Sequence, residues 1–420
     1  MKISVPKGTK DILPVEMNSW RYIENLFTEV CMNAGYGEIR TPVFEYTGLF
    51  NRGVGETTDI VQKEMYTFED KGGRSLTLRP EGTASIARSY IENGMSSLPQ
   101  PVKLFYKITA YRYENVQKGR YREFNQMGAE VLGAESPNAD IELISMLGNF
   151  FSKLGIGDLS LELNSIGCPV CRPAYNELLK EYYKDKIDGM CEDCRRRYET
   201  NPLRLIDCKE EKCIEASKDV PYIADNLCDD CSGHFSSLKT GLDRLDINYT
   251  LNKQIVRGLD YYKKTVFEFV SENVGTQGTV CGGGRYDGLI GSLGGSDVPG
   301  VGFSMGTERL IMELESRNLL PEFEKVPEIY FVTVGEKSYA YARKISCALR
   351  KADVYTEMDL LGRSVKAQMK DANRKKAKYA VVMGEEEISL NKAEILVMET
   401  GERREVSLDS IYKRIIEKKV

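Results

Sequence analysis

The sequence predicts a mixed α/β protein, in which an α+β core carries a Cys-rich helical insertion and is followed by a smaller α/β domain. Three observations lead to this fold class. Residues 104–130 form two extended runs joined by a basic loop, eight cysteines gather in the middle of the chain, and short apolar runs alternate with helical stretches after Pro327. We therefore expect a core over residues 1–325, an insertion over 166–245 and a C-terminal domain over 326–420.

The composition is that of an ordinary globular protein, with 41% hydrophobic and 29% charged residues over 420 positions. No apolar run approaches the ~20 residues that a membrane span needs, and the first residues lack the apolar centre of a signal peptide. We therefore expect a cytoplasmic protein with no membrane partner. Because the net charge is −5, any contact with nucleic acid must come from local basic patches.

The N-terminal part begins with a predicted helix and a strand-to-helix junction. Apolar residues recur at helical spacing over 20–34, and Gly35 is well placed to end that helix. Residues 75–79 read as a short strand that turns into a helix at Glu81 and Thr83. Acceptors on these two residues can reach into a pocket and hold a substrate ammonium, although such residues at a helix start also act as caps.

Residues 104–130 predict a β-hairpin that carries a polar pocket beside a phosphate clamp. An arginine and a glutamate point to one face of the first run, basic residues surround a glycine in the loop, and an amide, a bare backbone and a carboxylate share one face of the second run. These residues are Arg112, Glu114, Gly119, Arg120, Arg122, Gln126, Gly128 and Glu130. Arginine suits the clamp because its planar fork meets phosphate oxygens bidentately. The alternative is a solvated hairpin with surface charges.

The Cys-rich middle predicts metal binding. Its cysteines fall into four pairs: Cys168 and Cys171, Cys191 and Cys194, Cys208 and Cys213, Cys228 and Cys231. Thiolates bind Zn²⁺ tetrahedrally, and two residues between ligands let both sulfurs reach one ion. We expect at least one structural zinc, in one or two sites, with the assignment of pairs to sites left open. The alternative is a set of reduced thiols on small helices. The single histidine, His234, is expected at a solvent-facing helix position.

Glycine-containing stretches follow the insertion. Residues 257–262 read Arg-Gly-Leu-Asp-Tyr-Tyr, and a predicted strand over 265–270 comes next. The later glycine run, 282–284, precedes no Gly-Lys-Ser/Thr and shows no dinucleotide fingerprint, so we expect its backbone to approach a flat ligand closely.

Prolines and charges over 319–327 predict a linker to the C-terminal domain. Beyond it, the predicted strands are 329–334, 354–357, 379–383 and 395–398, and the predicted helices are 338–351, 364–376 and 408–418. This alternation is typical of a compact α/β domain. A basic cluster near Arg374 can meet an RNA backbone, although a basic helix end is usually just solvated.

Several of these stretches resemble the class II aminoacyl-tRNA synthetases of subclass IIa, in the histidine-specific form. The hairpin, over 111–114, 117–122 and 124–126, resembles motif 2. Further resemblances are the N-terminal segment (7–14), motif 1 (35–45), the amino-acid-binding segment (78–84), two histidine-specific motifs (257–262 and 282–289) and motif 3 (300–310). The resemblance implies an antiparallel sheet flanked by helices, a homodimer and a C-terminal anticodon-binding domain.

The resemblance also implies a two-step reaction, in which ATP with Mg²⁺ activates histidine and the histidyl group then passes to histidine tRNA. The catalytic residues would be Arg112 and Arg257, and ATP would be bound by Arg112, Glu114, Arg120 and Arg309. Histidine would be bound by Glu81, Thr83, Gln126, Glu130, Tyr261, Tyr262 and Tyr286, and tRNA by Gln117 and Arg122. Asn115 and Val116 depart from the family's motif 2 loop, which puts recognition of the tRNA acceptor end in doubt.

Two other functions stay open. A non-catalytic regulatory subunit of ATP phosphoribosyltransferase shares the catalytic fold, but such subunits lack the C-terminal domain and usually part of the arginine set. Another class IIa synthetase, such as the prolyl or threonyl enzyme, is disfavoured by residues 257–262. Amino-acid-dependent exchange between ATP and pyrophosphate separates all three.

Overall fold

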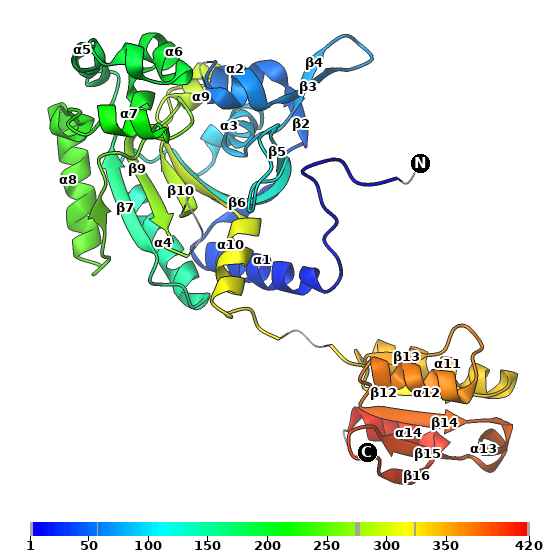
Figure 1. The fold of residues 1–420 in the computed structure, drawn as a ribbon. Helices are drawn as coiled ribbons and strands as arrows, with labels where there is room; N and C mark the ends of the chain where they lie inside the picture. Colours follow the sequence, from blue (N-terminus) through cyan, green and yellow to red (C-terminus); the bar gives the residue numbers. More distant parts are fainter. Residues whose placement is uncertain (1–2, 57, 274–277, 323–324, 418–420) are drawn as a thin grey trace. The chain divides into compact units, whose positions relative to one another are not determined.

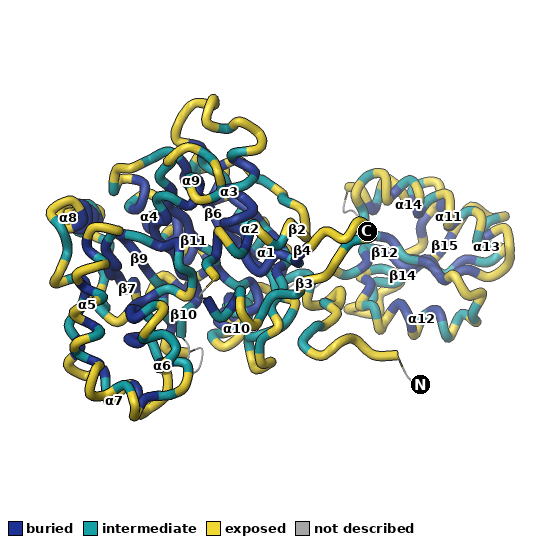
Figure 2. The backbone as a smooth tube through the Cα atoms, turned by 90° about the horizontal axis from the view of Figure 1, so that it is seen from above, coloured by how far each residue is buried: buried dark blue, intermediate teal, exposed yellow. Residues whose placement is uncertain are grey.

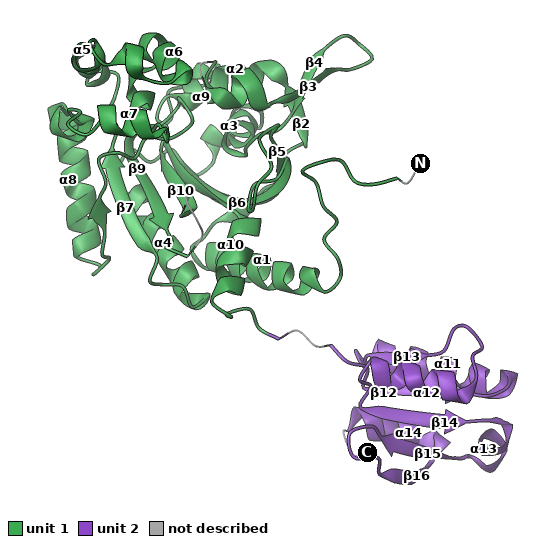
Figure 3. Ribbon diagram, viewed as in Figure 1, with its two compact units in different colours: residues 1–321 green, residues 322–420 purple. Residues whose placement is uncertain are grey.

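The computed structural model describes residues 3–56, 58–273, 278–322 and 325–417, and the chain divides into two compact units (Figure 3). The first unit is Met1–Pro321 and the second is Glu322–Val420. Residues 323 and 324 of the predicted linker, and the predicted helix end Lys418, lie outside the described residues. Within the described ranges, no helix is long and apolar enough to cross a membrane.

An eight-stranded sheet runs through the first unit in the order β1-β5-β6-β11-β10-β9-β7-β8 (Figure 1). The strands are β1 (Gly37–Glu38), β5 (Val102–Tyr111), β6 (Glu123–Leu132), β7 (Ser160–Ser165), β8 (Thr250–Leu251), β9 (Lys263–Val270), β10 (Thr279–Arg285) and β11 (Gly300–Gly306). The six central strands pair antiparallel, whereas the short edge strands β1 and β8 pair in parallel. The predicted fold class, with an antiparallel sheet at its centre, is confirmed.

One face of this sheet carries the larger apolar core. Most residues of β6, β10 and β11 are buried (Figure 2). The helices that contribute to this core are α1 (Glu16–Asn33), α4 (Asn138–Lys153), α8 (Asp229–Asp243) and α10 (Thr307–Ser316). In α1, Ile23, Phe27 and Val30 are buried, and the rings of Phe27 and Phe105 meet edge-on with centroids 6.0 Å apart. The apolar spacing predicted for this helix therefore faces β5 and the core.

The other face of the sheet is covered by α3 (Thr83–Glu92), α9 (Leu289–Ser292) and the insertion. The insertion contains α5 (Arg172–Tyr183), η3 (Ile187–Gly189), α6 (Glu192–Thr200), η4 (Pro202–Leu205), α7 (Glu211–Ala216) and η5 (Ile223–Asp225). A second core joins Tyr106 and Tyr286 of the sheet to Tyr175 and Leu179 of α5. The insertion is thus packed onto the sheet rather than tethered to it by its ends alone.

A smaller sheet lies beside α2 (Thr47–Val54) and the π-helix η1 (Ile60–Glu64). Its order is β2-β4-β3, made of β2 (Phe44–Tyr46), β3 (Tyr66–Glu69) and β4 (Ser75–Leu78), all antiparallel. Together with β1 and the 3-10 helix η2 (Met95–Ser97), these elements complete the first unit. The strand predicted at 75–79 is present, and it leads directly into α3.

The second unit is a five-stranded sheet in the order β13-β12-β14-β15-β16. Its elements are β12 (Ile329–Thr333), α11 (Glu336–Lys351), β13 (Thr356–Met358), α12 (Val365–Arg374), β14 (Tyr379–Met383), α13 (Glu385–Leu390), β15 (Lys392–Val397), β16 (Arg403–Ser407) and α14 (Leu408–Ile416). All predicted strands and helices are found. The prediction missed α13 and β16 because their charged residues obscure the apolar period. In the basic cluster, Arg374 and Lys375 both pair with Asp371.

His234 is buried, which corrects the expected solvent-facing position. It lies on the same stripe of α8 as Cys231, Phe235 and Leu238, and this stripe packs toward α4. Its Nε2 is 3.7 Å from the carboxylate of Asp140, which in turn accepts hydrogen bonds from the fully buried Arg285 at 2.7 and 2.9 Å. The helical period of α8 places His234 on the buried side of the helix. The prediction put it toward solvent because histidine is polar.

Candidate active site

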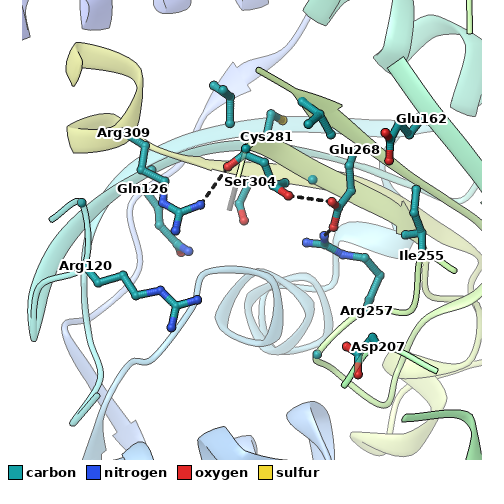
Figure 4. A pocket seen from close by; sticks show the side chains of 18 of the residues that line it. Arg120, Gln126, Glu162, Asp207, Ile255, Arg257, Glu268, Cys281, Ser304 and Arg309 are labelled. Carbon is teal, nitrogen blue, oxygen red and sulfur yellow. Dashed lines mark hydrogen bonds and ion pairs between the residues drawn. The ribbon is translucent and has the colours of Figure 1, made fainter. Parts of the chain in front are cut away.

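A cavity of about 560 Å³ opens where the β5–β6 hairpin, strands β9 to β11 and the insertion meet (Figure 4). Arg112, Arg257 and Arg309 all line it. Arg309 and Arg120 lie at one end, and Arg257 faces them across the open space (Figure 4). Three guanidinium groups that are widely separated in the sequence therefore converge on one volume.

Each of the three arginines is held by a neighbouring acceptor. Arg112 donates from Nε to the carbonyl of Pro80 at 2.9 Å. Arg257 forms an ion pair with Glu268, whose other carboxylate oxygen accepts a 2.7 Å hydrogen bond from the hydroxyl of Thr279. Arg309, in the first turn of α10, donates to the carbonyl of Thr279 at 2.9 Å. Strands β9 and β10 thus fix two of the guanidinium groups.

Two guanidinium groups, those of Arg309 and Arg120, lie at the same end of the cavity. Burial, and then the nearby charge of Arg120, lower the pKa of Arg309 below its ordinary value. The pKa of Arg257 moves the other way: burial lowers it, but Glu268 and the neighbouring tyrosines raise it more. Arginine stays charged at neutral pH in either case. Like charges brought together at one end of a cavity favour a polyanion such as a triphosphate.

Glycines in β10 and β11 make room for functional side chains. A Cβ atom on Gly282 would overlap the guanidinium of Arg257, and one on Gly302 would overlap the carboxylate of Glu130. Gly282 also lines the cavity. The glycine run 282–284 therefore forms part of β10. Besides the expected approach of a flat ligand, the close approach of Arg257 is a second reason for glycine at position 282.

A fully buried carboxylate, Glu130, lies on the same face of β6 as Gln126. It accepts hydrogen bonds from the hydroxyls of Thr83 at 2.8 Å, Tyr106 at 3.2 Å and Tyr286 at 2.6 Å. Burial raises the pKa of Glu130 to about 8, although these hydroxyls counteract part of that effect. A buried acceptor of this kind suits a ligand that brings its own N–H group.

Tyrosine rings enclose this carboxylate. Tyr261 lies with its ring centroid 4.7 Å from that of Tyr262 and 5.7 Å from that of Tyr286. Burial is the main reason that the pKa of each of these three phenols lies above its ordinary value. All three therefore stay neutral and can donate hydrogen bonds.

Glu81 serves as the cap that the sequence left as an alternative. Its carboxylate accepts from the backbone N–H of Thr83 at 2.6 Å and of Ala84 at 2.8 Å, at the start of α3. Burial raises the pKa of Glu81 as well. Because Thr83 also donates to Glu130, this junction links the two buried carboxylates.

The residues predicted to contact tRNA lie outside the cavity lining. Gln117 is exposed in the hairpin loop, where its backbone pairs with that of Arg120. The guanidinium of Arg122 stacks on Tyr113, 3.7 Å from the ring centroid. Glu114 does line the cavity, and its carboxylate is 3.4 Å from the guanidinium of Arg120.

Four cavity or pocket residues were missed by the sequence analysis. Glu268 holds Arg257, and Tyr106 donates to Glu130. Asp207 and Lys209, from the insertion, line the cavity opposite the hairpin. Only Glu268 had a signal, since it is a single acid inside an otherwise apolar strand. The position of the insertion wall depends on packing that no local pattern reveals.

The eight cysteines form two four-sulfur clusters, which resolves the pairing left open by the sequence. The first cluster is Cys168, Cys171, Cys228 and Cys231, and the second cluster is Cys191, Cys194, Cys208 and Cys213. Within each cluster all sulfurs lie within 4.8 Å of one another. The two middle pairs are nested inside the outer two.

The spacing of the sulfurs fits a tetrahedral metal. The distances from Cys168 to Cys171, from Cys168 to Cys228 and from Cys191 to Cys208 are each 3.8 Å. A tetrahedron with Zn–S bonds of ~2.3 Å has edges of about 3.8 Å. Backbone N–H groups also point at the sulfurs, for example from Cys228 to Cys171 at 3.2 Å. Both clusters can therefore hold a metal ion.

Comparisons with known proteins agree with this geometry. The family model described as histidyl-tRNA synthetase matches residues 8–170 and 208–310, and the model described as anticodon binding domain matches residues 328–418. The chain is 57% identical over 415 residues to a histidine–tRNA ligase of Acetivibrio thermocellus, covering 99% of this chain and 100% of that one. It is 50% identical to a histidine–tRNA ligase of Caldanaerobacter subterraneus, with 99% and 100% covered. The crystal structure of apo S. aureus histidyl-tRNA synthetase superposes with a TM-score of 0.83 at 39% identity, with 99% and 100% covered.

The raised pKa of Glu130 predicts a pH-dependent contribution to stability. Between the usual value of 4.5 and about 8, the folded chain holds more protons at this carboxyl than the unfolded chain, so the stability that this group contributes falls as pH rises. Glu130→Gln removes this titration. The unfolding temperature of this variant relative to the parent should therefore rise between about pH 5 and about pH 9. Thermal unfolding without ligand measures it.

The exposed Glu135 provides the control for this experiment, because Glu135→Gln should follow the parent at every pH. A difference between Glu130→Gln and the parent that stays constant with pH would rule out a raised pKa at Glu130.

Proposed function

The chain belongs to the histidyl-tRNA synthetase family, and we propose how its cavity carries out the ATP-dependent joining of histidine to tRNA. The activity is that of a histidine–tRNA ligase. A regulatory subunit without the C-terminal domain is not favoured, since the relatives match over the full length and the anticodon-binding model matches residues 328–418. The convergence of Arg112, Arg257 and Arg309 on one cavity carries the mechanism below.

In the first step, the carboxylate of histidine attacks the α-phosphorus of ATP. A new bond forms between the carboxylate oxygen and phosphorus, the bond to the bridging oxygen breaks, and pyrophosphate leaves. No protein base is needed because the nucleophile is already an anion. Arg112 and Arg257 flank the α-phosphate and stabilise the charge that develops on it, so catalysis rests on positioning and electrostatics.

The positions of the charged residues indicate how the rest of the nucleotide is bound. Arg309 and Arg120 at the far end of the cavity hold the terminal phosphates, and Glu114 orients the nucleotide. Carboxylates in the cavity wall, such as that of Glu162, would help to hold Mg²⁺, which would supply positive charge beside the phosphates of ATP. Gly306, at the end of β11, lines the cavity beside Arg309 and leaves room for the adenine.

Histidine specificity rests on the buried carboxylate. We place the imidazole between Glu130 and Tyr262, so that each ring nitrogen has a partner and a ring without N–H groups leaves a buried acceptor unpaired. Discrimination of ~10⁴ is within reach of such a site without a separate proofreading domain. Glu81, Thr83 and Gln126 bind the α-amino group. Tyr261 and Tyr286 close the pocket around the substrate.

In the second step, the histidyl group passes from the adenylate to the 3′-terminal adenosine of tRNA. Gln117 and Arg122 lie in the hairpin loop, outside the cavity lining, where an acceptor stem entering the cavity passes them. The second unit, which the anticodon-binding model matches, binds the other end of the tRNA. A tRNA substrate is consistent with the cytoplasmic location expected from the sequence.

The role of Arg257 can be tested by Arg257→Ala. Removing one preorganised charge donor at the α-phosphate should lower histidine-dependent ATP/pyrophosphate exchange by roughly a hundredfold or more. The exposed Arg244 provides a matched control, and Arg244→Ala should exchange at the parent rate. Titration calorimetry with histidine shows whether the variant's pocket is intact. Near-normal exchange in Arg257→Ala would remove Arg257 from the mechanism.

We propose that both cysteine clusters hold structural zinc. Elemental analysis of the purified protein should then find two zinc ions per chain, one for each of the clusters. Dialysis against a chelator should lower the unfolding temperature, because metal binding contributes to folding free energy. Less than about half an equivalent of zinc, in protein purified without chelator, would exclude both sites.

We also propose a homodimer, formed through the motif 1 region. Phe44 in this region, and Tyr46 and Phe68 beside it on the small sheet, are exposed, and the ring centroids of Phe44 and Phe68 lie 6.4 Å apart. Adjacent exposed aromatic side chains mark an interaction surface. Sedimentation should give twice the chain mass of 47.4 kDa, and Phe44→Glu should shift the protein toward the monomer. A monomer at micromolar concentration would contradict this.

A further inference from the structure

Side chains of the insertion hold the Arg-Gly-Leu-Asp-Tyr-Tyr segment, residues 257–262, at three points. Arg204 donates to the backbone carbonyl of Arg257 at 3.1 Å. Asn201 donates to the carboxylate of Asp260 at 2.9 Å. Arg172 donates to the backbone carbonyl of Tyr262. The segment that supplies Arg257 to the cavity is therefore braced from the insertion side.

The braces are tied to different cysteine clusters. Arg172 follows Cys171 of the first cluster, whereas Asn201 and Arg204 lie between Cys194 and Cys208 of the second. Cys208 is flanked by two residues that line the cavity, and the carboxylate of one of them, Asp207, pairs with Arg204 at 3.2 Å. The second cluster thus encloses the brace on Arg257 together with the insertion's wall of the cavity.

The two α-helices at the second cluster, α6 and α7, have little apolar anchoring of their own, whereas the short helix η4 between them buries Leu203 and Leu205 on either side of Arg204. In α6 the single fully buried residue is Cys194, and in α7 it is Cys213. By contrast, α5 and α8 next to the first cluster bury several large side chains, among them Tyr175, Leu179, Phe235 and Leu238. Amphipathic helices are normally held by an apolar stripe. In α6 and α7 the cysteine sulfurs take that place.

A second anchor of α6 points to the same site. Arg197 pairs with Asp59 at 2.6 Å and Arg196 pairs with it at 3.2 Å. Asp59 precedes the π-helix η1, whose Glu64 accepts at its carbonyl a 2.7 Å hydrogen bond from the N–H of Tyr113 in motif 2. These ion pairs are half-exposed, so their contribution is modest. They connect α6, through Asp59 and η1, to the motif 2 hairpin. They are too weak to hold α6 in place by themselves.

We propose that a metal ion in the second cluster positions Arg257, so that this cluster acts in histidine activation and not only in the stability of the insertion. The inference rests on the proposed roles of Arg257 and of zinc. The metal holds Cys191, Cys194, Cys208 and Cys213 together, this fixes Arg204 and Asn201, and they fix the backbone that presents the guanidinium. The first cluster acts through Arg172 on Tyr262 and hence on the histidine pocket. The two metal sites therefore control different steps of substrate use.

The test uses ATP/pyrophosphate exchange, which needs no tRNA, with zinc content measured on the same samples. Cys213→Ser lies away from the cavity and should lose about one zinc equivalent. It should lower kcat of exchange about tenfold or more while changing KM for histidine less than about threefold. Cys168→Ser should also lose about one equivalent but should mainly raise KM for histidine, because its brace reaches Tyr262.

Arg204→Ala provides a second test that does not depend on the folding of a cysteine variant. It leaves every cysteine in place, so it should keep full zinc content and still lower kcat about tenfold. If both act through Arg257, the double variant Arg204→Ala with Cys213→Ser should lose less than the product of the single losses. Lys212→Ala, an exposed neighbour of Cys213, is the matched control and should keep both zinc and kcat.

Failure of the proposed function and failure of the positioning role give different results in these measurements. A parent protein without histidine-dependent exchange overturns the proposed function itself. A parent that exchanges normally but contains no metal overturns the metal in this inference. Zinc loss in Cys213→Ser with kcat within about twofold of the parent, or unchanged kcat in Arg204→Ala, overturns the positioning role.

Discussion

The ion pair between Arg257 and Glu268 is the constraint on which the rest of the site depends. Glu268 projects from β9, where Thr279 of β10 holds its second oxygen at 2.7 Å, so the guanidinium is locked to two strands of the central sheet. Gly282 leaves the space that the guanidinium occupies. A charged group held in this way needs little reorganisation when a phosphate arrives, which is the condition for strong electrostatic catalysis. Removing either residue leaves the charge of the other uncompensated, so the position of each side chain depends on the other.

The sequence predicted the fold class from local apolar patterns, whereas the arginine set was implied by the resemblance of residues 111–114, 257–262 and 300–310 to family motifs. Arg112 and Arg309 stand at the ends of strand and helix patterns that a period of two or 3.6 reveals. The assignment of the cysteine pairs to sites was left open, because spacing along the chain does not show that the fold nests the two middle pairs inside the outer two. Asp207 was missed for the same reason. Asp207 lines the cavity because the insertion packs against the sheet at that point. No periodic pattern in the sequence indicates this packing.

Two buried carboxylates, Glu81 and Glu130, share one junction, and this explains the chemistry of the pocket. Burial raises the pKa of both, because their surroundings disfavour the ionised form of each carboxyl group. Thr83 connects them, with its N–H on Glu81 and its hydroxyl on Glu130. Under the proposed binding mode, a ligand that carries an ammonium and a ring N–H brings positive charge and adds N–H donors to the hydroxyl donors already present. Binding energy thus arises from relieving two unfavourable burials at once.

The insertion shows how a small, polar segment can take part in a precise site. Helices α6 and α7 at the second cluster each bury a single residue, a cysteine, and the buried apolar residues between them lie in the short helix η4, for example Leu203 and Leu205. In the proposed zinc site, four thiolates on one ion would join these helices through a rigid tetrahedral centre whose geometry is set by bond lengths. Rigidity is what the neighbouring segment requires, because a guanidinium displaced by about 1 Å loses much of its effect on the transition state. The sheet fixes the Arg257 side chain through Glu268, and the insertion fixes its backbone through Arg204, so the residue is held from both sides.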